Sequence, residues 1–378
     1  MRIPAFATRH CEPTDPREVA RPDDGRRDAM KFLSVRLDGS VALFLAMTML
    51  ASTALPARAQ DTALIDAAKK EGQVVWYTTL IVNQIIRPLK TAFEKKYPGV
   101  TLQFTRADDV PTAEKILAEG RAGRVQADIF DGIVNMLPLE QAGLLSPYSV
   151  PNEAEYPAQL KAKDGYWTAE IMYVFTPGIN TTLLPKSEAP KTFADLIDPK
   201  LKGKMAWNGS SMAGAYGFVG NILTTMGEDK GMAYLKALAA QRVVNVEASS
   251  RAVLDQVIAG EYAMNLMAFN HHVMISARKG APVDWLKLEP APVMLDALGL
   301  TKQAPHPHAA QLLLDFLLSP EGQKVFQQSD YLPALPSVPA VVAGLRPGEG
   351  GFKADFLQPE QIYRNLPRWQ KVTQDLFR

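Results

Sequence analysis

Apolar residues recur at two different spacings along residues 61 to 175. Helical spacing predicts helices, and short apolar runs predict strands. The expected helices are at 61–71, at 81–97 and from 108 to 120, and the expected strands are at 74–77, 100–105 and 127–130. A β-α-β-α-β order calls for a parallel sheet with right-handed crossovers. The first part of the chain therefore reads as an α/β unit.

The same alternation returns after a strand at 172–175, which Pro177-Gly178 is expected to end. Thr192 and Asp195 have the spacing of a capping box. The further expected strands are at 204–207, 243–246, 263–269 and 291–300, and the helices are at 212–226, 230–241, 249–260, 308–318, from Ser319-Pro320, and from Pro359. A second α/β unit is thus expected over roughly 176–288.

The apolar run Ala263–Phe269 is followed by three polar residues, Asn270, His271 and His272. In an open α/β sheet, ligands bind outside the carboxyl ends of the strands. The three residues are therefore either ligand contacts or the polar end of a strand that has reached the surface. Adjacent residues on a strand point to opposite faces, so one histidine is expected to face a cleft while the other packs.

The N-terminal region has the pattern of a secretory signal. Val41–Leu55 is apolar, follows Lys31 and Arg36, and precedes Ala57-Arg58-Ala59. A run of this length is shorter than the roughly 20 residues that span a bilayer. Cleavage is expected after Ala59, which would release a periplasmic protein; an uncleaved anchor is the alternative. Translation starts at Met1 or at Met30.

Bulk composition excludes several classes of function. The 378 residues suffice for about two domains, and the net charge of +1 gives no reason to expect a nucleic-acid partner. The single cysteine, Cys11, lies before the predicted cleavage site, so thiolate chemistry is not expected. No nucleophile elbow, P-loop or zincin motif occurs, and an enzyme is not expected.

Several stretches together resemble one family. They are GQVVWYTT at 72–79, AFEKKYPGV at 92–100, 127–148 with its QAGLLSPY ending, GINTTLLP at 178–185, DLIDPKLKGK at 195–204, and FLLSPEGQ at 316–323 with Asp330-Tyr331 after it. In order and spacing they resemble the periplasmic solute-binding proteins of ABC importers, in the cluster that includes the ferric-ion-binding proteins.

The resemblance implies a type II periplasmic-binding-protein fold of class α/β, with a ligand cleft between two lobes. It places one lobe at 61–175 plus 289–330, the other at 176–288, and a tail at 331–378 that packs on both. It further implies a monomer without a cofactor. The lobes would close around a solute, and the protein would then dock on an inner-membrane permease.

The chain departs from the ferric members at the metal ligands. Those proteins carry Asn-Tyr-Tyr where Asn270-His271-His272 stand here, a histidine where Thr78-Thr79 stand, and a glutamate near Ile133. Imidazole suits zinc, copper, nickel or ferrous iron better than ferric iron. His271 and His272 remain candidate metal ligands, but ferric binding is in doubt.

The family's anion site corresponds to a predicted helix start. Ser210 and Ser211 are expected to cap that helix, and Gly214, Ala215 and Tyr216 would present backbone N–H groups to an anion. An ordinary N-cap is the alternative. The resemblance favours the anion site.

Strand ends supply the remaining candidates. Tyr77, Thr78 and Thr79 follow the first strand and Asp131 follows the third. Asp108 and Asp109 are candidates too, or helix caps. An acidic residue in the cleft would favour a cationic ligand. Asn135 and Tyr331 could line the rim, whereas His306 and His308 are expected to lie in a solvated turn.

The sequence thus predicts a periplasmic binding protein for a small anionic organic solute, such as a phosphonate, phosphate ester or carboxylate. The alternative is a metal ion, held by histidine together with a bound anion.

Overall fold

The computed structural model describes residues 55–377. One sheet contains parallel β1 (Gln73–Thr78), β2 (Thr101–Arg106) and β3 (Ile129–Gly132), with β1 in the middle. The predicted β-α-β-α-β unit is confirmed. This sheet continues through β10 (Ala291–Thr301), which runs antiparallel to β3 and β5 (Trp167–Asn180) and also pairs with β4 (Leu145–Ser146) and β11 (Ala354–Leu357).

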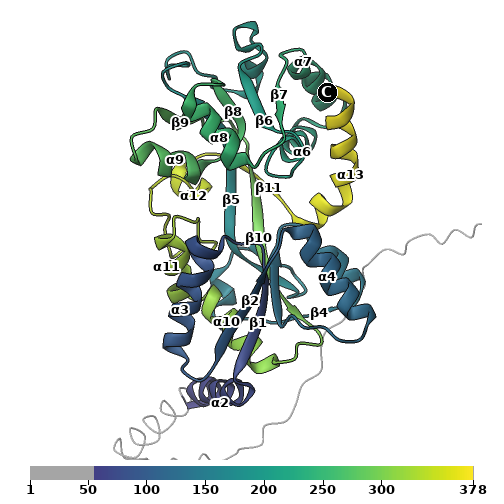
Figure 1. Ribbon diagram of the computed structural model, residues 1–378, viewed down its shortest axis with the longest axis vertical. Helices are drawn as coiled ribbons and strands as arrows, with labels where there is room; N and C mark the ends of the chain where they lie inside the picture. Colours follow the sequence, from purple (N-terminus) through teal and green to yellow (C-terminus); the bar gives the residue numbers. More distant parts are fainter. Residues whose placement is uncertain (1–54, 378) are drawn as a thin grey trace, which may run out of the picture. The chain divides into compact units, whose positions relative to one another are not determined.

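A second sheet is built around the far end of β5. There β5 pairs with β8 (Met264–Phe269) and β9 (Val283–Trp285), and β6 (Met205–Asn208) runs parallel to β8 and β7 (Val244–Val246). The strand order β2-β1-β3-β10-β5-β8-β6-β7 shows that the two sheets meet at β5. Figure 1 shows β5 and β10 running between the two groups of strands.

Helices cover both sheets. The first sheet carries α2 (Leu55–Glu71), α3 (Arg87–Lys96), α4 (Asp109–Arg121), α5 (Met136–Gln141), α10 (Pro307–Leu318) and α11 (Pro320–Gln328). The second carries α6 (Ala215–Met226), α7 (Glu228–Ala239), α8 (Ser250–Ala259) and α9 (Asn270–Arg278). Short elements are the turns at 82–86, 153–155, 158–160, 193–197 and 199–201, and α12 (Pro347–Gly350).

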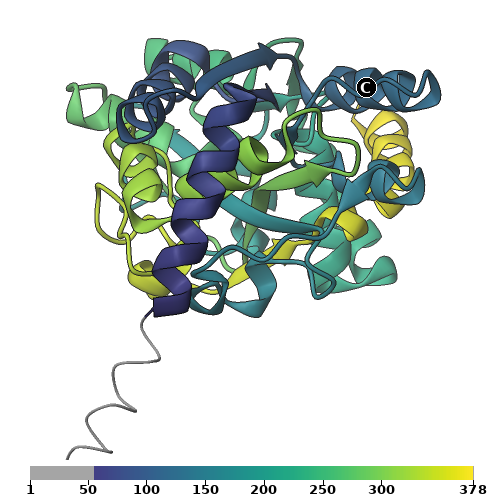
Figure 2. The ribbon, with the colours of Figure 1, turned by 90° about the horizontal axis from the view of Figure 1, so that it is seen from below.

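Two large hydrophobic cores correspond to the two sheets. The first gathers side chains such as Trp76, Phe93 and Phe316, and the second gathers Trp207, Phe218 and Trp369. Trp76, Trp167 and Trp207 are buried. Figure 2 looks from the side that carries α2, whose Glu71 carboxylate accepts hydrogen bonds from His308 and Ala309 near the start of α10.

The C-terminal helix α13 (Pro359–Leu376) belongs to the second core and not to the first. Its Trp369 ring lies against the Cα of Gly220 on α6, where an added Cβ would come within 2.8 Å of the ring. Within the tail, α13 thus packs against the second core, while packing of the tail on both lobes stays a prediction. The residue boundaries of the two lobes stay a prediction.

Three expectations about elements were wrong. Pro177-Gly178 does not end β5, because the register shifts there and a proline is tolerated at such a bulge. The helix expected over 81–97 begins with a wider π turn at Val82–Ile86. Asn270, His271 and His272 form the first turn of α9 and do not extend the strand.

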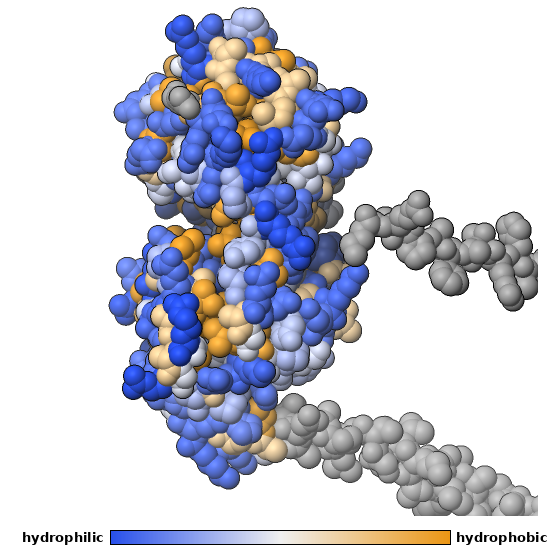
Figure 3. Space-filling view, turned by 90° about the vertical axis from the view of Figure 1, so that its right-hand side faces the viewer, coloured by the Kyte–Doolittle hydropathy of each residue, from blue (hydrophilic) through white to orange (hydrophobic). Residues whose placement is uncertain are grey.

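The predicted signal run Val41–Leu55 lies almost entirely outside the described residues. Ala59, after which cleavage is expected, falls within α2. No helix within 55–377 has the length and apolar character needed to cross a membrane. The face shown in Figure 3 is mainly hydrophilic, with apolar side chains in small groups.

Candidate functional site

Thr79 and Asp131 meet where β1 and β3 end, as the parallel sheet predicts. The backbone N–H and the hydroxyl of Thr79 both donate to Asp131 Oδ1, at 2.6 and 2.7 Å. Thr78 is buried beside them, and its hydroxyl accepts from Leu80 N–H at 3.2 Å. Gly132 follows with a φ of +148°, and a Cβ there would strike the side chains of Asn135 and Asp109. The two predicted strand ends therefore form one polar cluster.

Two further carboxylates join this cluster from β5 and β10, neighbouring strands of the first sheet. Asp296 on β10 accepts from the Tyr173 hydroxyl at 3.2 Å and lies 3.3 Å from the Thr79 hydroxyl. Glu170 on β5 is fully buried, and neither of its carboxylate oxygens has a hydrogen-bond partner. One oxygen from each of Asp131, Glu170 and Asp296 lies within 4.8 Å of the others.

A β-bulge places Glu170 in this position. Asp296 of β10 pairs with Ile171, and the next residue, Ala297, pairs with Ala169, so Glu170 is the extra residue of β5. A bulge re-aims a side chain that regular alternation would send elsewhere. The buried acid is thus positioned by the local backbone irregularity.

Burial makes the charged forms of these acids costly. It raises the pKa of Asp131 to about 7, although hydrogen bonds from Thr78 and Thr79 act against this. Burial also raises the pKa of Glu170 and of Asp296 well above the usual range, and the neighbouring carboxylates add to both effects. None of the ion pairs formed within 55–377 includes any of the three.

His271 and His272 lie side by side at the start of α9, with ring centroids 4.3 Å apart. His271 is 2% exposed, and its ring stacks on Tyr173 at 6.3 Å between centroids. Both nitrogens of His271 and Nδ1 of His272 are buried without a partner. Burial lowers the pKa of His271 well below the usual value and that of His272 to about 4.

His272 faces a pocket of about 420 Å³. The pocket collects residues from both groups of elements: Ile81, Gln84, Ser329 and Asp330 on one side, and Arg251, His272, Ile275 and Lys279 on the other. Arg278, next to this pocket, forms an ion pair with Asp330. The arrangement agrees with one histidine packing and the other facing a cleft.

The start of α6 differs in detail from the predicted cap. Gly214 is the N-cap residue, without a side-chain cap, so Ser210 and Ser211 do not cap this helix. The Ser210 hydroxyl donates to Glu247 at 3.0 Å instead, while Ser211 Oγ is buried without a partner. A Cβ on Gly214 would come within 2.1 Å of the Asn208 carbonyl oxygen, so only glycine fits there.

Tyr216 is half-buried at the same helix start, and Ala215 is fully buried. The backbone N–H groups of Gly214 and Tyr216 both donate to the Ser211 carbonyl at 3.2 Å, so two of the three donors predicted for an anion are already engaged. Burial raises the pKa of Tyr216, and the Glu247 carboxylate adds to the effect. That carboxylate lies close enough to influence any ligand here.

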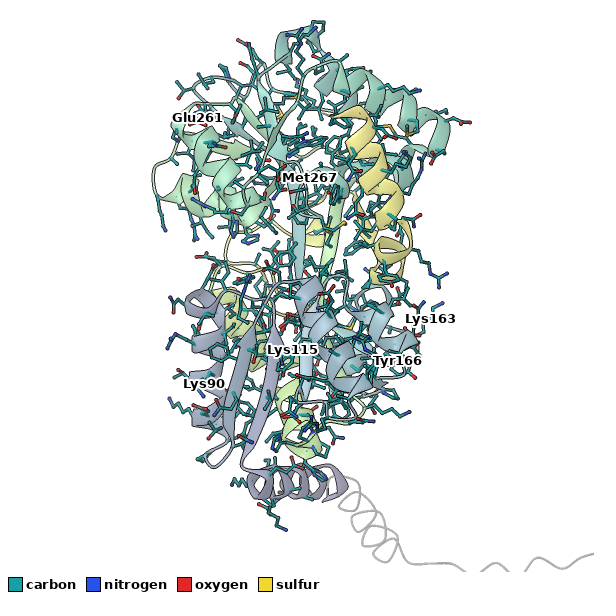
Figure 4. The ribbon with its side chains drawn as sticks, turned by 45° about the vertical axis from the view of Figure 1, so that its right-hand side comes forward. Lys90, Lys115, Lys163, Tyr166, Glu261 and Met267 are labelled. Atoms are coloured by element: carbon teal, nitrogen blue, oxygen red, sulfur yellow. The ribbon has the colours of Figure 1, made fainter. Side chains whose placement is uncertain are left out.

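Tyr77 does not belong to the cluster at the strand ends. Its hydroxyl donates to Glu119 on α4 at 2.8 Å, and Lys115 lies 5.0 Å from the centre of its ring. Figure 4 labels Lys115 and shows α4 among the lower group of elements. Alternation along β1 explains the error, because successive residues of a strand face opposite sides.

Asp108 is the N-cap residue of α4 by position, but its side chain makes no cap hydrogen bond. Asp109 instead accepts from the backbone N–H groups of Ile133 and Val134, at 2.6 and 3.3 Å. Asn135 and Tyr331 are buried and do not line a rim.

His306 and His308 each pair with a different carboxylate and do not form a metal-binding pair. His306 Nδ1 lies 2.9 Å from Asp128 Oδ2, and His308 Nδ1 lies 2.7 Å from Glu71 Oε1. The expected solvated turn is not seen, because His306 is the N-cap residue of α10 and His308 lies in the first turn of that helix.

Sequence reasoning missed Glu170 and Asp296. Asp296 stands inside the run 291–300, which was read only as a strand, and Glu170 stands among apolar residues just before the predicted strand at 172–175. Carboxylates are almost never fully buried unless they are paired, so an acid within an apolar strand is itself a signal. That signal could have identified both residues.

The profile of the family described as "Bacterial extracellular solute-binding protein" matches residues 127–349. The chain belongs to this family. Members are solute-binding proteins, and the cluster that includes the ferric-binding proteins is the part of the family that this chain resembles.

Three relatives illustrate the similarity. An uncharacterized protein of Haemophilus influenzae is 29% identical over 82% of this chain and 88% of its own length. The Fe(3+)-binding periplasmic protein of Serratia marcescens is 22% identical over 77% and 84%. Iron uptake protein A1 of Synechocystis is 24% identical over 70% and 75%. The similarity therefore extends over most of each family member.

Solved structures confirm the type II two-lobed fold. The iron- and citrate-bound protein of Trichodesmium superposes with a TM-score of 0.68 at 22% identity, covering 81% of this chain and 99% of that one. The periplasmic binding protein AfuA of Actinobacillus pleuropneumoniae, with fructose-6-phosphate bound, gives 0.66 at 24%, covering 80% and 99%. At these identities the likeness concerns the fold alone.

Proposed function

We propose that this solute-binding protein captures a small anionic organic solute in the periplasm and delivers it to the inner-membrane permease of an ABC importer. The solute class is a phosphonate, phosphate ester or carboxylate. Capture occurs by closure of the two lobes, since a ligand that contacts both lobes favours the closed state.

The buried Ser211 hydroxyl carries the proposal about the ligand. It has no partner and stands just before the α6 N-terminus. The helix dipole favours a negative group at such a place, and the free hydroxyl adds a donor. Arg251 and Lys279 line the 420 Å³ pocket together with His272 and supply positive charge there.

The ligands bound to two structural neighbours support the same class of solute. One structural neighbour holds fructose-6-phosphate and another holds citrate with iron. Glu247 beside Ser210 acts against an anion, because its carboxylate is 3.0 Å from the Ser210 hydroxyl. An anion bound here must therefore lie on the Ser211 side of the loop.

A thermal-shift panel tests the anion site directly. We expect inorganic phosphate, sugar phosphates, phosphonates or carboxylates to raise the melting temperature of the wild type, because a ligand that binds only the folded state stabilises it. Ser211→Ala should weaken binding of the active anion by about tenfold, the equivalent of one hydrogen bond to a charged group.

Ser249→Ala is the matched control. Ser249 caps α8 by accepting from Ala252 N–H at 3.2 Å, so its loss should cost about 1 kcal/mol of stability and leave anion affinity unchanged. Stabilisation by neutral or cationic solutes alone, or equal affinity in Ser211→Ala and the wild type, would contradict the anion site.

The second candidate function is import of a metal ion held by histidine together with an anion. The adjacent rings of His271 and His272, with unpartnered nitrogens, favour it. Elemental analysis for Fe, Zn, Cu and P on protein purified undenatured from its periplasm separates the two. Near-stoichiometric metal that His272→Gln abolishes would establish this candidate, and phosphorus without metal would establish the first.

A further inference from the structure

The three buried carboxylates at the meeting point of the two sheets lack the partners that such groups need. Asp131 Oδ2, Asp296 Oδ1 and both oxygens of Glu170 are buried without a hydrogen bond. Leaving a buried charged acceptor unsatisfied costs several kcal/mol. The anion site at α6 does not use these groups, so they call for a separate explanation.

The surroundings of Glu170 indicate that the missing partner of the cluster carries positive charge. Asp131 and Asp296 are each satisfied on one oxygen, by Thr79 and by Tyr173. Glu170 is 0% exposed, has no donor at all, and directs a carboxylate oxygen to within 4.8 Å of both aspartates. A third acid turned toward two others raises their mutual repulsion unless a positive charge lies among them.

The spacing and the burial fit a metal ion better than an organic cation. One oxygen from each of the three carboxylates lies within 4.8 Å of the others, close enough for all three to ligate one ion. The free oxygens each expose less than 1 Å² to solvent, so a bulky amine does not reach them.

We propose that Asp131, Glu170 and Asp296 bind a divalent cation of the hard, oxygen-preferring class, for which Ca²⁺ is the probe. The donors are carboxylates, which such ions prefer. They come from β3, β5 and β10, so the ion ties together the strands on which both sheets depend.

This cation is separate from the transported solute. The structure places no histidine nitrogen in the acidic cluster, and imidazole, the metal ligand weighed for the solute site, favours softer ions. Binding of the hard cation should therefore persist in Ser211→Ala and His272→Gln proteins. Failure of the anion site and failure of the cation site are then distinguished by different ligands and different variants.

Equilibrium dialysis of chelator-treated full-length mature protein against ⁴⁵Ca²⁺ at about pH 8 tests the site, because the carboxylates must be deprotonated to ligate. We expect about one Ca²⁺ per chain and a Ca²⁺-dependent rise in melting temperature. Glu170→Gln and Asp296→Asn should each weaken Ca²⁺ binding at least tenfold, since affinity follows the number of charged ligands.

Asp355→Asn is the matched control. Asp355 lies on β11 opposite Pro292 of β10, with a buried unpartnered oxygen of its own, but it is not part of the cluster. Its Ca²⁺ affinity should equal that of the wild type. Circular dichroism shows whether each variant is folded, and the wild-type measurement stands even if one variant is not.

Two results would overturn the cation site. One is wild-type protein that binds no Ca²⁺, Mg²⁺ or Mn²⁺ at millimolar concentration, which would mean that the carboxylates are held protonated and share their protons. The other is equal Ca²⁺ affinity in Glu170→Gln, Asp296→Asn and the wild type, which would place any bound ion elsewhere.

Discussion

At the scale of single residues, the unusual feature is a set of buried polar atoms without partners. Ser211 Oγ, the nitrogens of His271 and the oxygens of Glu170 all belong to it. Native proteins satisfy nearly all such atoms, so exceptions tend to mark sites that await a ligand. Among the described residues, three of the places that carry such atoms are the start of α6, the start of α9 and the bulge of β5.

His272 should make stability depend on pH in a defined direction. Its pKa is about 4 in the folded protein, below its usual value of 6.5 in an unfolded chain. The unfolded state therefore takes up the proton first as the pH falls. The stability that neutral His272 provides is present above about pH 6.5 and is lost progressively toward pH 4.

We expect His272→Gln to remove about 3 kcal/mol of the pH dependence of unfolding between pH 6.5 and 4. Urea unfolding at several pH values measures it. His308→Gln is the control, because His308 is exposed and pairs with Glu71 at the surface. An unchanged pH profile in His272→Gln would show that this histidine is not buried in solution.

At the scale of elements, the C-terminal helix α13 packs on α6, which lies much earlier in the sequence. Trp369 of α13 covers the side of α6 that carries Gly220, so the packing of α6 depends on α13. The amphipathic pattern of the tail showed a helix, but it did not show which helix the tail would cover.

Gly220→Ala should destabilise the protein by about 1–3 kcal/mol. Alanine is normally better than glycine within a helix by about 1 kcal/mol, but a Cβ here would lie 2.8 Å from the Trp369 ring. Thermal and urea unfolding measure the change. In the control Gly348→Ala, the added Cβ meets nothing within 4 Å, so stability should stay within about 0.5 kcal/mol. A stabilised Gly220→Ala protein would mean that α13 is not packed on α6.

Most strands and helices were predicted from the spacing of apolar residues, because each element turns an apolar face, with its own period, toward a hydrophobic core. Strand β5 did not, since Pro177-Gly178 normally ends a strand. There the Pro177 carbonyl accepts from Leu286 N–H at 2.9 Å, a tertiary bond that local sequence does not reveal. The convergence of Glu170 with Asp131 and Asp296 could not be predicted for the same reason: it arises from the bulge at Glu170, which depends on the strand that pairs with β5.

At the scale of the whole described chain, one exposed ion pair joins the two groups of elements at the 420 Å³ pocket. Arg278 of α9 pairs with Asp330, which follows α11. Asp330 has a φ of +63°, a conformation that asparagine also tolerates. Exposed pairs contribute at most about 1 kcal/mol, enough to shift a balanced open–closed equilibrium by a few fold.

Asp330→Asn should therefore leave unfolding nearly unchanged and increase the population of the open form in the absence of solute. Small-angle scattering at low salt measures this as a larger radius of gyration, and high salt should give the wild type the same change. Asp375→Asn breaks a pair within α13 alone and should change nothing. Identical scattering from Asp330→Asn and the wild type would show that the Arg278–Asp330 ion pair does not stabilise the closed form.

The way in which the chain crosses between the sheets limits how the protein can be divided. The chain enters the second sheet along β5 and leaves it along β10, and these strands pair, as in Val174 with Val293. The intervening segment thus begins and ends side by side and resembles an insertion. Yet a fragment of that segment alone would expose the face of α6 that Trp369 covers. A transplant of this half into another binding protein would have to carry β11 and α13 with it.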